Sequence, residues 1–220
     1  MDWQDRCVAG VARSTMREAV AVVAAADPAF EAVVARAPMC TIGNGTRGGS
    51  HFDSLVKSVV AQQLSTKAAD TISGRLSEAL DHDVTPQGVL ALDEELLRAA
   101  GLSRAKARTI RGLALALHSG DLDLDRAIDS GDDNYLRTEL QALWGIGRWT
   151  VEMFLMFDLH RLDIWPVGDL AMRRGWQVLH EAVGDIAPQD IEVLGDPFRP
   201  YRSVAAWYCW WAVDGDNPSW

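Results

Sequence analysis

The sequence is divided into short helical segments by residues that begin and end helices. Ser50 and Asp53 form a capping-box-like start, and Ser103 and Gly120 provide the N-cap and the end of a later segment. Between such signals, apolar residues recur at i, i+3 and i+4, which gives each segment one face suited to burial. No block of the sequence alternates apolar and polar residues with period two. The pattern therefore predicts an all-α fold.

Helical signals run along nearly the whole chain, with two interruptions. The glycine-rich segment 41–50 (TIGNGTRGGS) predicts a linker between a helical N-terminal arm and the main body. Pro166 restricts the residue before it, so residues 161–168 are expected to be extended or looped. The last helices are expected at about 148–159, 169–182, 188–194 and 201–213.

The composition fits a globular protein of the cytoplasm. The chain has 220 residues, 48% of them hydrophobic, which suffices for one domain with a core. No apolar run reaches the roughly 18 residues that a membrane span requires, and the N-terminus shows no signal-peptide pattern. Three scattered cysteines (Cys7, Cys40 and Cys209) and five histidines without ligand spacing predict neither a disulfide framework nor a zinc site.

The net charge of −10 argues against a nucleic-acid partner, but the charge is unevenly distributed. Acidic residues gather in 121–133, whereas basic residues gather in 103–111, at Arg148, and at Arg173 and Arg174. Electrostatic recognition depends on such local patches rather than on the total charge. Solvated helix faces are the alternative interpretation of the basic groups.

A tight glycine-containing turn joins two predicted helices at residues 143–148 (LWGIGR). Glycine permits positive φ and the close approach of another molecule, and Ile146 can fill the space between the helices. The following helix presents unpaired N–H groups and the positive end of its dipole, which favour a phosphate, and Arg148 adds charge there. Such backbone contacts to phosphate are independent of base sequence. A simple corner between two helices is the alternative.

Five segments occur in order along the chain: AQQLSTKAA (61–69), GLSRAKARTIRGLA (101–114), LWGIGRWTVEMF (143–154), WPVGDLAMRRGW (165–176) and RPYRSVAAWYCW (199–210). Together they resemble the helix-hairpin-helix DNA glycosylases, and within these the AlkA-type 3-methyladenine DNA glycosylase II branch. The resemblance covers roughly residues 50–213 and is far more specific than the glycine turn alone. It implies a two-lobed α-helical fold with the active-site cleft between the lobes.

The resemblance also implies how the chain is organised. We expect a single domain over residues 1–220, in which the N-terminal arm (1–50) joins the C-terminal helices in one lobe. The hairpin-containing lobe is expected at about 65–160.

A monovalent cation, K⁺ or Na⁺, is implied at the hairpin. By register it would be held by the main-chain carbonyls of Gln141, Leu143 and Ile146, in a structural role that catalysis does not require. The iron–sulfur branch of the family is not expected, because its four-cysteine loop is absent.

Asp169 follows a glycine at the start of a predicted helix. From the residues alone, an aspartate at this place is readily explained as an N-cap. The resemblance makes it the catalytic aspartate. Breaking the bond between base and sugar develops positive charge on the deoxyribose, and a fixed anion stabilises that charge. Because an N-alkylated purine already carries positive charge, it leaves without a strong acid, and one carboxylate suffices.

The resemblance assigns a base pocket to Trp149, Met153 and Trp210, with Met153 where the best-known relatives carry a tyrosine. Indole suits a flipped, cationic base through stacking and cation–π attraction, although core packing is the alternative for each tryptophan. Relatives that also nick the strand carry a Schiff-base lysine at the position of Trp149. The lysines of this chain lie elsewhere (Lys57, Lys67 and Lys106), so we expect a monofunctional enzyme without AP lyase activity.

Further DNA contacts are implied at three places. Gln63 and Leu64 occupy the loop from which the family inserts a side chain into the gap left by flipping, with a helix C-cap and a core leucine as alternatives. Arg104 and Lys106, with Arg108, resemble a second phosphate-facing segment or a solvated helix face. At the hairpin the implied contacts come from Gly145, Ile146, Gly147, Arg148 and Thr150.

The sequence thus predicts a monomeric DNA glycosylase of base excision repair. It would flip alkylated purines such as 3-methyladenine and 7-methylguanine out of double-stranded DNA and release them by hydrolysis. Two alternatives remain open. One is a glycosylase of the same fold for another lesion, such as hypoxanthine or etheno-adenine. The other is a non-catalytic protein that binds damaged DNA.

Overall fold

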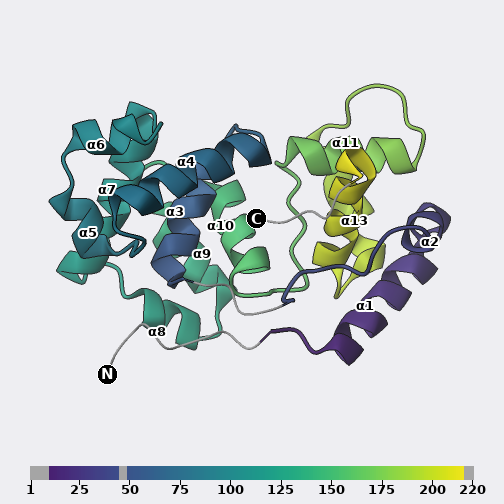
Figure 1. Ribbon diagram of the computed structural model, residues 1–220. Helices are drawn as coiled ribbons and strands as arrows, with labels where there is room; N and C mark the ends of the chain where they lie inside the picture. Colours follow the sequence, from purple (N-terminus) through teal and green to yellow (C-terminus); the bar gives the residue numbers. More distant parts are fainter. Residues whose placement is uncertain (1–9, 45–48, 216–220) are drawn as a thin grey trace. The chain divides into compact units, whose positions relative to one another are not determined.

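The computed structural model describes residues 10–44 and 49–215, and all regular structure in these ranges is helical (Figure 1). The all-α prediction is therefore confirmed. In the same ranges, no helix combines the length and the apolar character that crossing a membrane demands. Cys7 and part of the predicted linker, residues 45–48, lie outside the described residues. The helices, in chain order, are α1 (Arg13–Ala26), α2 (Pro28–Val34), α3 (His51–Ala61), α4 (Thr66–Ala79), α5 (Pro86–Ala91), α6 (Glu94–Ala99), α7 (Arg104–Ser119), α8 (Leu124–Asp129), α9 (Asp133–Gln141), α10 (Arg148–Phe157), α11 (Leu170–Leu179), α12 (Pro188–Leu194), the 3₁₀ turn η2 (Asp196–Phe198) and α13 (Arg202–Asp214).

The helix boundaries follow the capping residues. Ser50 Oγ accepts a hydrogen bond from the Asp53 N–H at 3.1 Å, and Ser103 caps α7 in the same way. At the other end of α7, Gly120 takes the left-handed conformation with φ +79°. These starts and this end were predicted from the sequence, because a cap satisfies helix-terminal backbone groups that would otherwise lack partners.

Two helix ends and one whole helix differ from the sequence prediction. α10 and α11 end about half a turn to a turn early, and the backbone enters the left-handed region shortly after each of them, at His160 and at Glu181. The helix α8 was missed because its acidic segment was interpreted only as charge. Asp123 caps it by accepting the Arg126 N–H, and acidic residues near a helix N-terminus are stabilising.

The described chain forms two compact units, one of residues 49–154 and one of residues 10–44 together with 155–215. α10 begins in the first unit and ends in the second. In the second unit, the N-terminal helices α1 and α2 contact the C-terminal helix α13 (Figure 1).

The first unit is built around α3, which contacts α4 and α7. Almost every side chain of α3 is buried, so this helix is enclosed by its neighbours rather than lying on a surface. α5 and α6 both pack on α7, whose inner face is buried through residues such as Ile110 and Leu113. α7 therefore contacts α5 and α6, and it also contacts the 143–148 turn at Thr109.

The second unit is built around α13, whose residues 203–210 are all buried. α13 crosses α11 closely at Gly175, where a Cβ atom would overlap the main-chain carbonyl of Cys209. Four aromatic rings pack together beside this crossing, with centroid distances of 4.6 to 6.3 Å: Phe30, Trp165, Trp176 and Phe198. The α11–α13 pair is thus fixed by a backbone contact and by an aromatic core.

Cys40 and Cys209 are free and buried. Burial raises the pKa of the Cys40 thiol to about 12 and that of Cys209 well above its usual value. Both side chains therefore remain protonated thiols at neutral pH and act as small apolar residues of the core.

We predict that Gly175→Ala destabilises the protein. The added methyl group meets backbone rather than a movable side chain, so α11 and α13 have to separate, at a cost of about 1–3 kcal/mol or more. Thermal unfolding measures this as a lower Tm. Gly74→Ala in α4 is the matched control, because nothing lies within 4 Å of its added Cβ, and alanine favours a helix. A Gly175→Ala variant that melts no earlier than the Gly74→Ala variant contradicts the crossing described here.

Candidate functional site

The turn between α9 and α10 is seated on α7. Gly145 has φ +83°, and a Cβ atom at this position would overlap the Thr109 side chain of α7. Ile146 is buried, and its N–H donates to the Leu143 carbonyl at 3.2 Å. Gly145 is therefore glycine for two reasons within the fold, namely its backbone conformation and its contact with α7.

Neither constraint that requires glycine at position 145 applies to Gly147. Its φ is not positive, and a Cβ atom there would have nothing within 4 Å. Gly147 lies immediately before Arg148, the first residue of α10, where backbone N–H groups lack helical partners. The absence of a side chain thus leaves the N-terminus of α10 accessible to the close approach of another molecule.

A second contact holds the turn from the side of α3. Gln62 Nε2 donates to the Gly145 carbonyl at 3.0 Å and to Thr150 Oγ1 at 2.9 Å. Thr150, predicted as a DNA contact, is buried, and its hydroxyl accepts this bond. Sequence reasoning missed Gln62, since nothing in the pattern links it to a turn 83 residues away.

A cation–π contact flanks the turn. The Arg108 guanidinium of α7 lies 4.1 Å from the ring centroid of Trp144, whose side chain is 51% exposed. Arg104, one helical turn earlier, is also exposed. Arg108 and Trp144 therefore place an exposed positive charge beside the turn. Sequence reasoning grouped Arg108 with the basic face of α7 but could not foresee its aromatic partner.

Two of the predicted DNA-binding cations have partners inside the protein. Arg148 Nε bonds Glu152 Oε1 at 2.7 Å, and the Glu152 side chain is buried. Lys106 Nζ donates to the carbonyls of Val60 and Gln62 at 2.8 and 2.7 Å, at the C-terminal end of α3. Partial burial lowers the pKa of Lys106. DNA contacts from both residues stay predictions.

The loop after α3 presents the residues predicted to enter DNA. α3 ends at Ala61, and Ser65 caps α4. Between them, Gln63 has φ +58° and is exposed, and Leu64 is also exposed. The alternative in which Leu64 is a core leucine does not hold.

The main-chain oxygens predicted to hold a cation belong to the last residue of α9, Gln141, and to Leu143 and Ile146 in the turn that follows it. Within the described residues, no backbone N–H bonds the carbonyls of Gln141 or Ile146, and that of Leu143 accepts one bond, from Ile146. Neutral oxygen ligands at the negative end of a helix dipole suit an alkali cation. The residues present thus fit the predicted K⁺ or Na⁺ ion.

Asp169 is the N-cap of α11 and is buried. Its Oδ1 accepts the Met172 N–H at 2.7 Å and the Trp210 Nε1–H at 2.9 Å. The two donors come from different helices, α11 and α13, so together they fix the plane of the carboxylate. Both the N-cap interpretation and a positioned functional carboxylate are compatible with this geometry.

The predicted pocket residues have different environments. Trp149 is half-buried near the start of α10, and Met153 is buried. Trp210 is buried as well, and its ring centroid lies 5.7 Å from that of Phe157. The structure therefore gives Trp210 a role that the sequence did not indicate, which is to orient Asp169.

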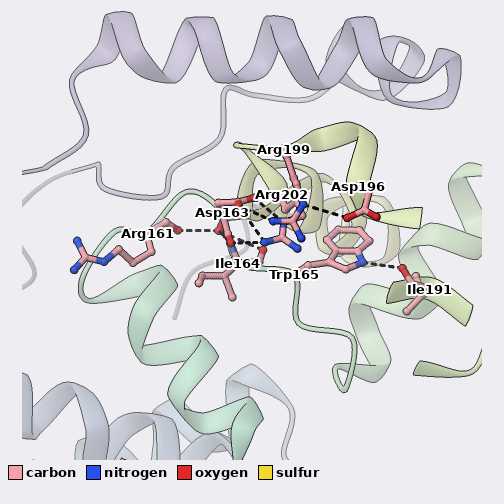
Figure 2. A network of polar contacts seen from close by, with 9 residues as sticks. Arg161, Asp163, Ile164, Trp165, Ile191, Asp196, Arg199 and Arg202 are labelled. Atoms are coloured by element: carbon pink, nitrogen blue, oxygen red, sulfur yellow. Dashed lines mark hydrogen bonds and ion pairs between the residues drawn. The ribbon is translucent and has the colours of Figure 1, made fainter. Parts of the chain in front are cut away.

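A polar network fixes the irregular segment that leads to Asp169 (Figure 2). The Asp163 carboxylate accepts bonds from Arg202 at 2.6 and 3.0 Å and from Arg199 at 3.1 Å. Ser203 Oγ donates to the Arg161 carbonyl and accepts the Ile164 N–H. These contacts tie residues 161–164 to the first turn of α13, the helix that carries Trp210.

Comparisons with known proteins identify the family of the chain. Residues 56–199 match the model of the HhH-GPD superfamily of base excision DNA repair proteins. The chain belongs to this family, which confirms the resemblance inferred from the five sequence segments.

The relatives are more specific. DNA-3-methyladenine glycosylase 1 of Schizosaccharomyces pombe is 34% identical over 163 residues, which are 72% of this chain and 71% of that protein. The solved structure of an S. pombe 3-methyladenine DNA glycosylase in complex with abasic DNA superposes with a TM-score of 0.80 at 29% identity, covering 88% of this chain and 95% of that one. A DNA-3-methyladenine glycosidase from Bacillus halodurans gives a TM-score of 0.72 at 34% identity, covering 89% of each chain.

We predict that the two hairpin glycines fail differently when each is replaced by alanine. Gly145→Ala strains the backbone and collides with Thr109, so its Tm falls. Gly147→Ala melts like the wild type, because its methyl group enters open space, but its affinity for duplex DNA falls several-fold. Thermal unfolding and fluorescence anisotropy with labelled duplex separate the two effects. Equal affinity for Gly147→Ala and the wild type would show that DNA does not approach this glycine.

Proposed function

We propose that the protein is a monofunctional DNA glycosylase that excises alkylated purines, of the 3-methyladenine and 7-methylguanine type, from double-stranded DNA. The observation that carries the proposal is the buried Asp169 carboxylate, oriented by the Trp210 indole and the N-terminus of α11 in a chain of the HhH-GPD family. The names of the relatives, which are 3-methyladenine DNA glycosylases, support the substrate class.

In the proposed reaction, the bond between the purine nitrogen and C1′ of the deoxyribose breaks. The bonding electrons leave with the base, which becomes neutral because N-alkylation had made it cationic. The sugar develops oxocarbenium-like charge, and the Asp169 carboxylate stabilises that charge. Water adds to C1′ and loses a proton, which the same carboxylate can accept, and the products are the free base and an abasic site.

The other predicted site residues have supporting roles in this proposal. Trp149, Met153 and Trp210 are the residues that we propose to contact the flipped base, and indole attracts a cationic purine more strongly than a neutral one. The hairpin binds backbone phosphate through the N-terminus of α10, and Gln63 and Leu64 enter the gap left by the flipped base. A K⁺ or Na⁺ ion bound by the main-chain carbonyls of Gln141, Leu143 and Ile146 would add positive charge near that phosphate.

We predict that Asp169→Asn abolishes excision without unfolding the protein. Asparagine is isosteric, and its Oδ1 can still accept both N–H groups, so the cap of α11 is preserved. Loss of the negative charge should lower the single-turnover rate of base release from methylated duplex DNA by about 10²–10³-fold or more.

The control for this variant is its affinity for lesion-containing duplex and its Tm, both of which should stay near those of the wild type. Base release at an equal rate by both proteins would exclude Asp169 as the catalytic group. Tight lesion binding without release by the wild type itself would instead favour a non-catalytic damage-binding protein.

We predict that the product strand remains intact after base release. Trp149 has no amine, so no Schiff base forms at that position and no β-elimination follows. Denaturing electrophoresis should show cleavage only after alkali treatment, and borohydride should trap no covalent complex. Strand breaks before alkali treatment are inconsistent with a monofunctional enzyme. A panel of duplexes with 3-methyladenine, 7-methylguanine, hypoxanthine and etheno-adenine defines the lesion range in the same assay.

A further inference from the structure

The loop between α3 and α4 is attached at its first residue, Gln62, from two sides. The side-chain amide of Gln62 bonds the hairpin, at the Gly145 carbonyl and the Thr150 hydroxyl. The main-chain carbonyl of Gln62 accepts Lys106 Nζ of α7 at 2.7 Å. All of these residues belong to one compact unit.

The orientation of the Gln62 amide follows from its partners. The Gly145 carbonyl can only accept a hydrogen bond, so the amide nitrogen and not the amide oxygen has to face it. The amide nitrogen carries two hydrogens and uses them for two acceptors, 3.0 and 2.9 Å away. Gln62 thereby joins two parts of the hairpin, the turn and the first helical turn of α10, to the end of α3.

Lys106 completes the attachment. Its ammonium group donates to the carbonyls of Val60 and Gln62, which lie at the end of α3 and have no helical partner of their own. A cation at a helix C-terminus is favourable, and this one replaces the missing backbone donors. The residue that follows, Gln63, is exposed and has φ +58°, so its direction depends on how Gln62 is held.

We propose that Gln62, supported by Lys106, is a positioning residue that couples the hairpin to the inserting residue Gln63. The hairpin and the loop then move as one rigid unit. When the hairpin binds backbone phosphate, Gln63 is already positioned to enter the base stack. The inference rests on the proposed function, in which Gln63 enters the gap left by a flipped base.

The test is a double-mutant cycle in which base flipping is measured directly. Gln62→Met keeps the length of the side chain and removes both donors. Gln87→Met, on the exposed surface of α5, is the matched control. The readouts are the fluorescence of 2-aminopurine next to the lesion, the affinity for undamaged duplex, the single-turnover rate of base release and the Tm of each variant.

We expect Gln62→Met to bind undamaged duplex within about twofold of the wild type, while flipping and base release fall by about tenfold, a coupling typical of contacting residues. In a Gln63→Ala background, Gln62→Met should add almost nothing, because the residue it positions is gone. Gln87→Met should match the wild type in every readout. Lys106→Met should lower flipping in the same non-additive way.

Two results for Gln62→Met overturn the proposal. One is that Gln62→Met lowers flipping by the same factor in the wild-type background and in the Gln63→Ala background. The other is a fall in undamaged-duplex affinity as large as the fall in flipping, which makes Gln62 a support of the hairpin alone. The fluorescence assay measures base flipping and does not require base release. A wild type that flips the base but does not release it would therefore contradict the proposed function, while the double-mutant cycle could still be interpreted. A Gln63→Ala variant with normal flipping also overturns the coupling, since nothing would remain to be positioned.

Discussion

The contact between Gly145 and Thr109 is the constraint on which the first unit depends. It brings the 143–148 turn against α7 so closely that no side chain fits between them. The turn can then expose Gly147 on its outer side, offer the Gly145 carbonyl to Gln62 and place Trp144 against Arg108. Each of these features requires the turn to be seated in this one position.

The second unit holds the buried Asp169 carboxylate in a fixed orientation. Burying a charged group is costly unless hydrogen bonds compensate, and the Asp169 carboxylate receives them from α11 and from α13. The orientation is therefore only as rigid as the α11–α13 crossing at Gly175. The Asp163–Arg202 network attaches the segment between α10 and Asp169 to α13 (Figure 2). Trp210 contacts the carboxylate through its N–H, and its ring packs beside Phe157.

Local features were readable from the sequence, and contacts between distant residues were not. The helix starts at Ser50 and Ser103 and the glycine turn rest on short-range rules, so the sequence was sufficient for them. The family followed from motif order. The roles of Gln62, and of Trp210 as a hydrogen-bond donor, depend on pairs 83 and 41 residues apart, which no periodicity encodes. The helix α8 was missed for another reason, because charge and capping use the same aspartates.

The internal pairing of basic residues has a consequence for how this protein responds to salt. An acidic chain that binds a polyanion relies on a few well-placed cations, and each cation that neutralises a phosphate displaces about one condensed counterion. Lys106 is engaged with carbonyl groups, and Arg148 is balanced by Glu152. In the proposed complex, these two side chains displace fewer ions than their number suggests. A hairpin that binds phosphate as proposed, through its glycines and the N-terminus of α10, also displaces few ions, because it offers dipoles rather than full charges. DNA binding of this proposed kind tolerates salt better than binding by a basic surface.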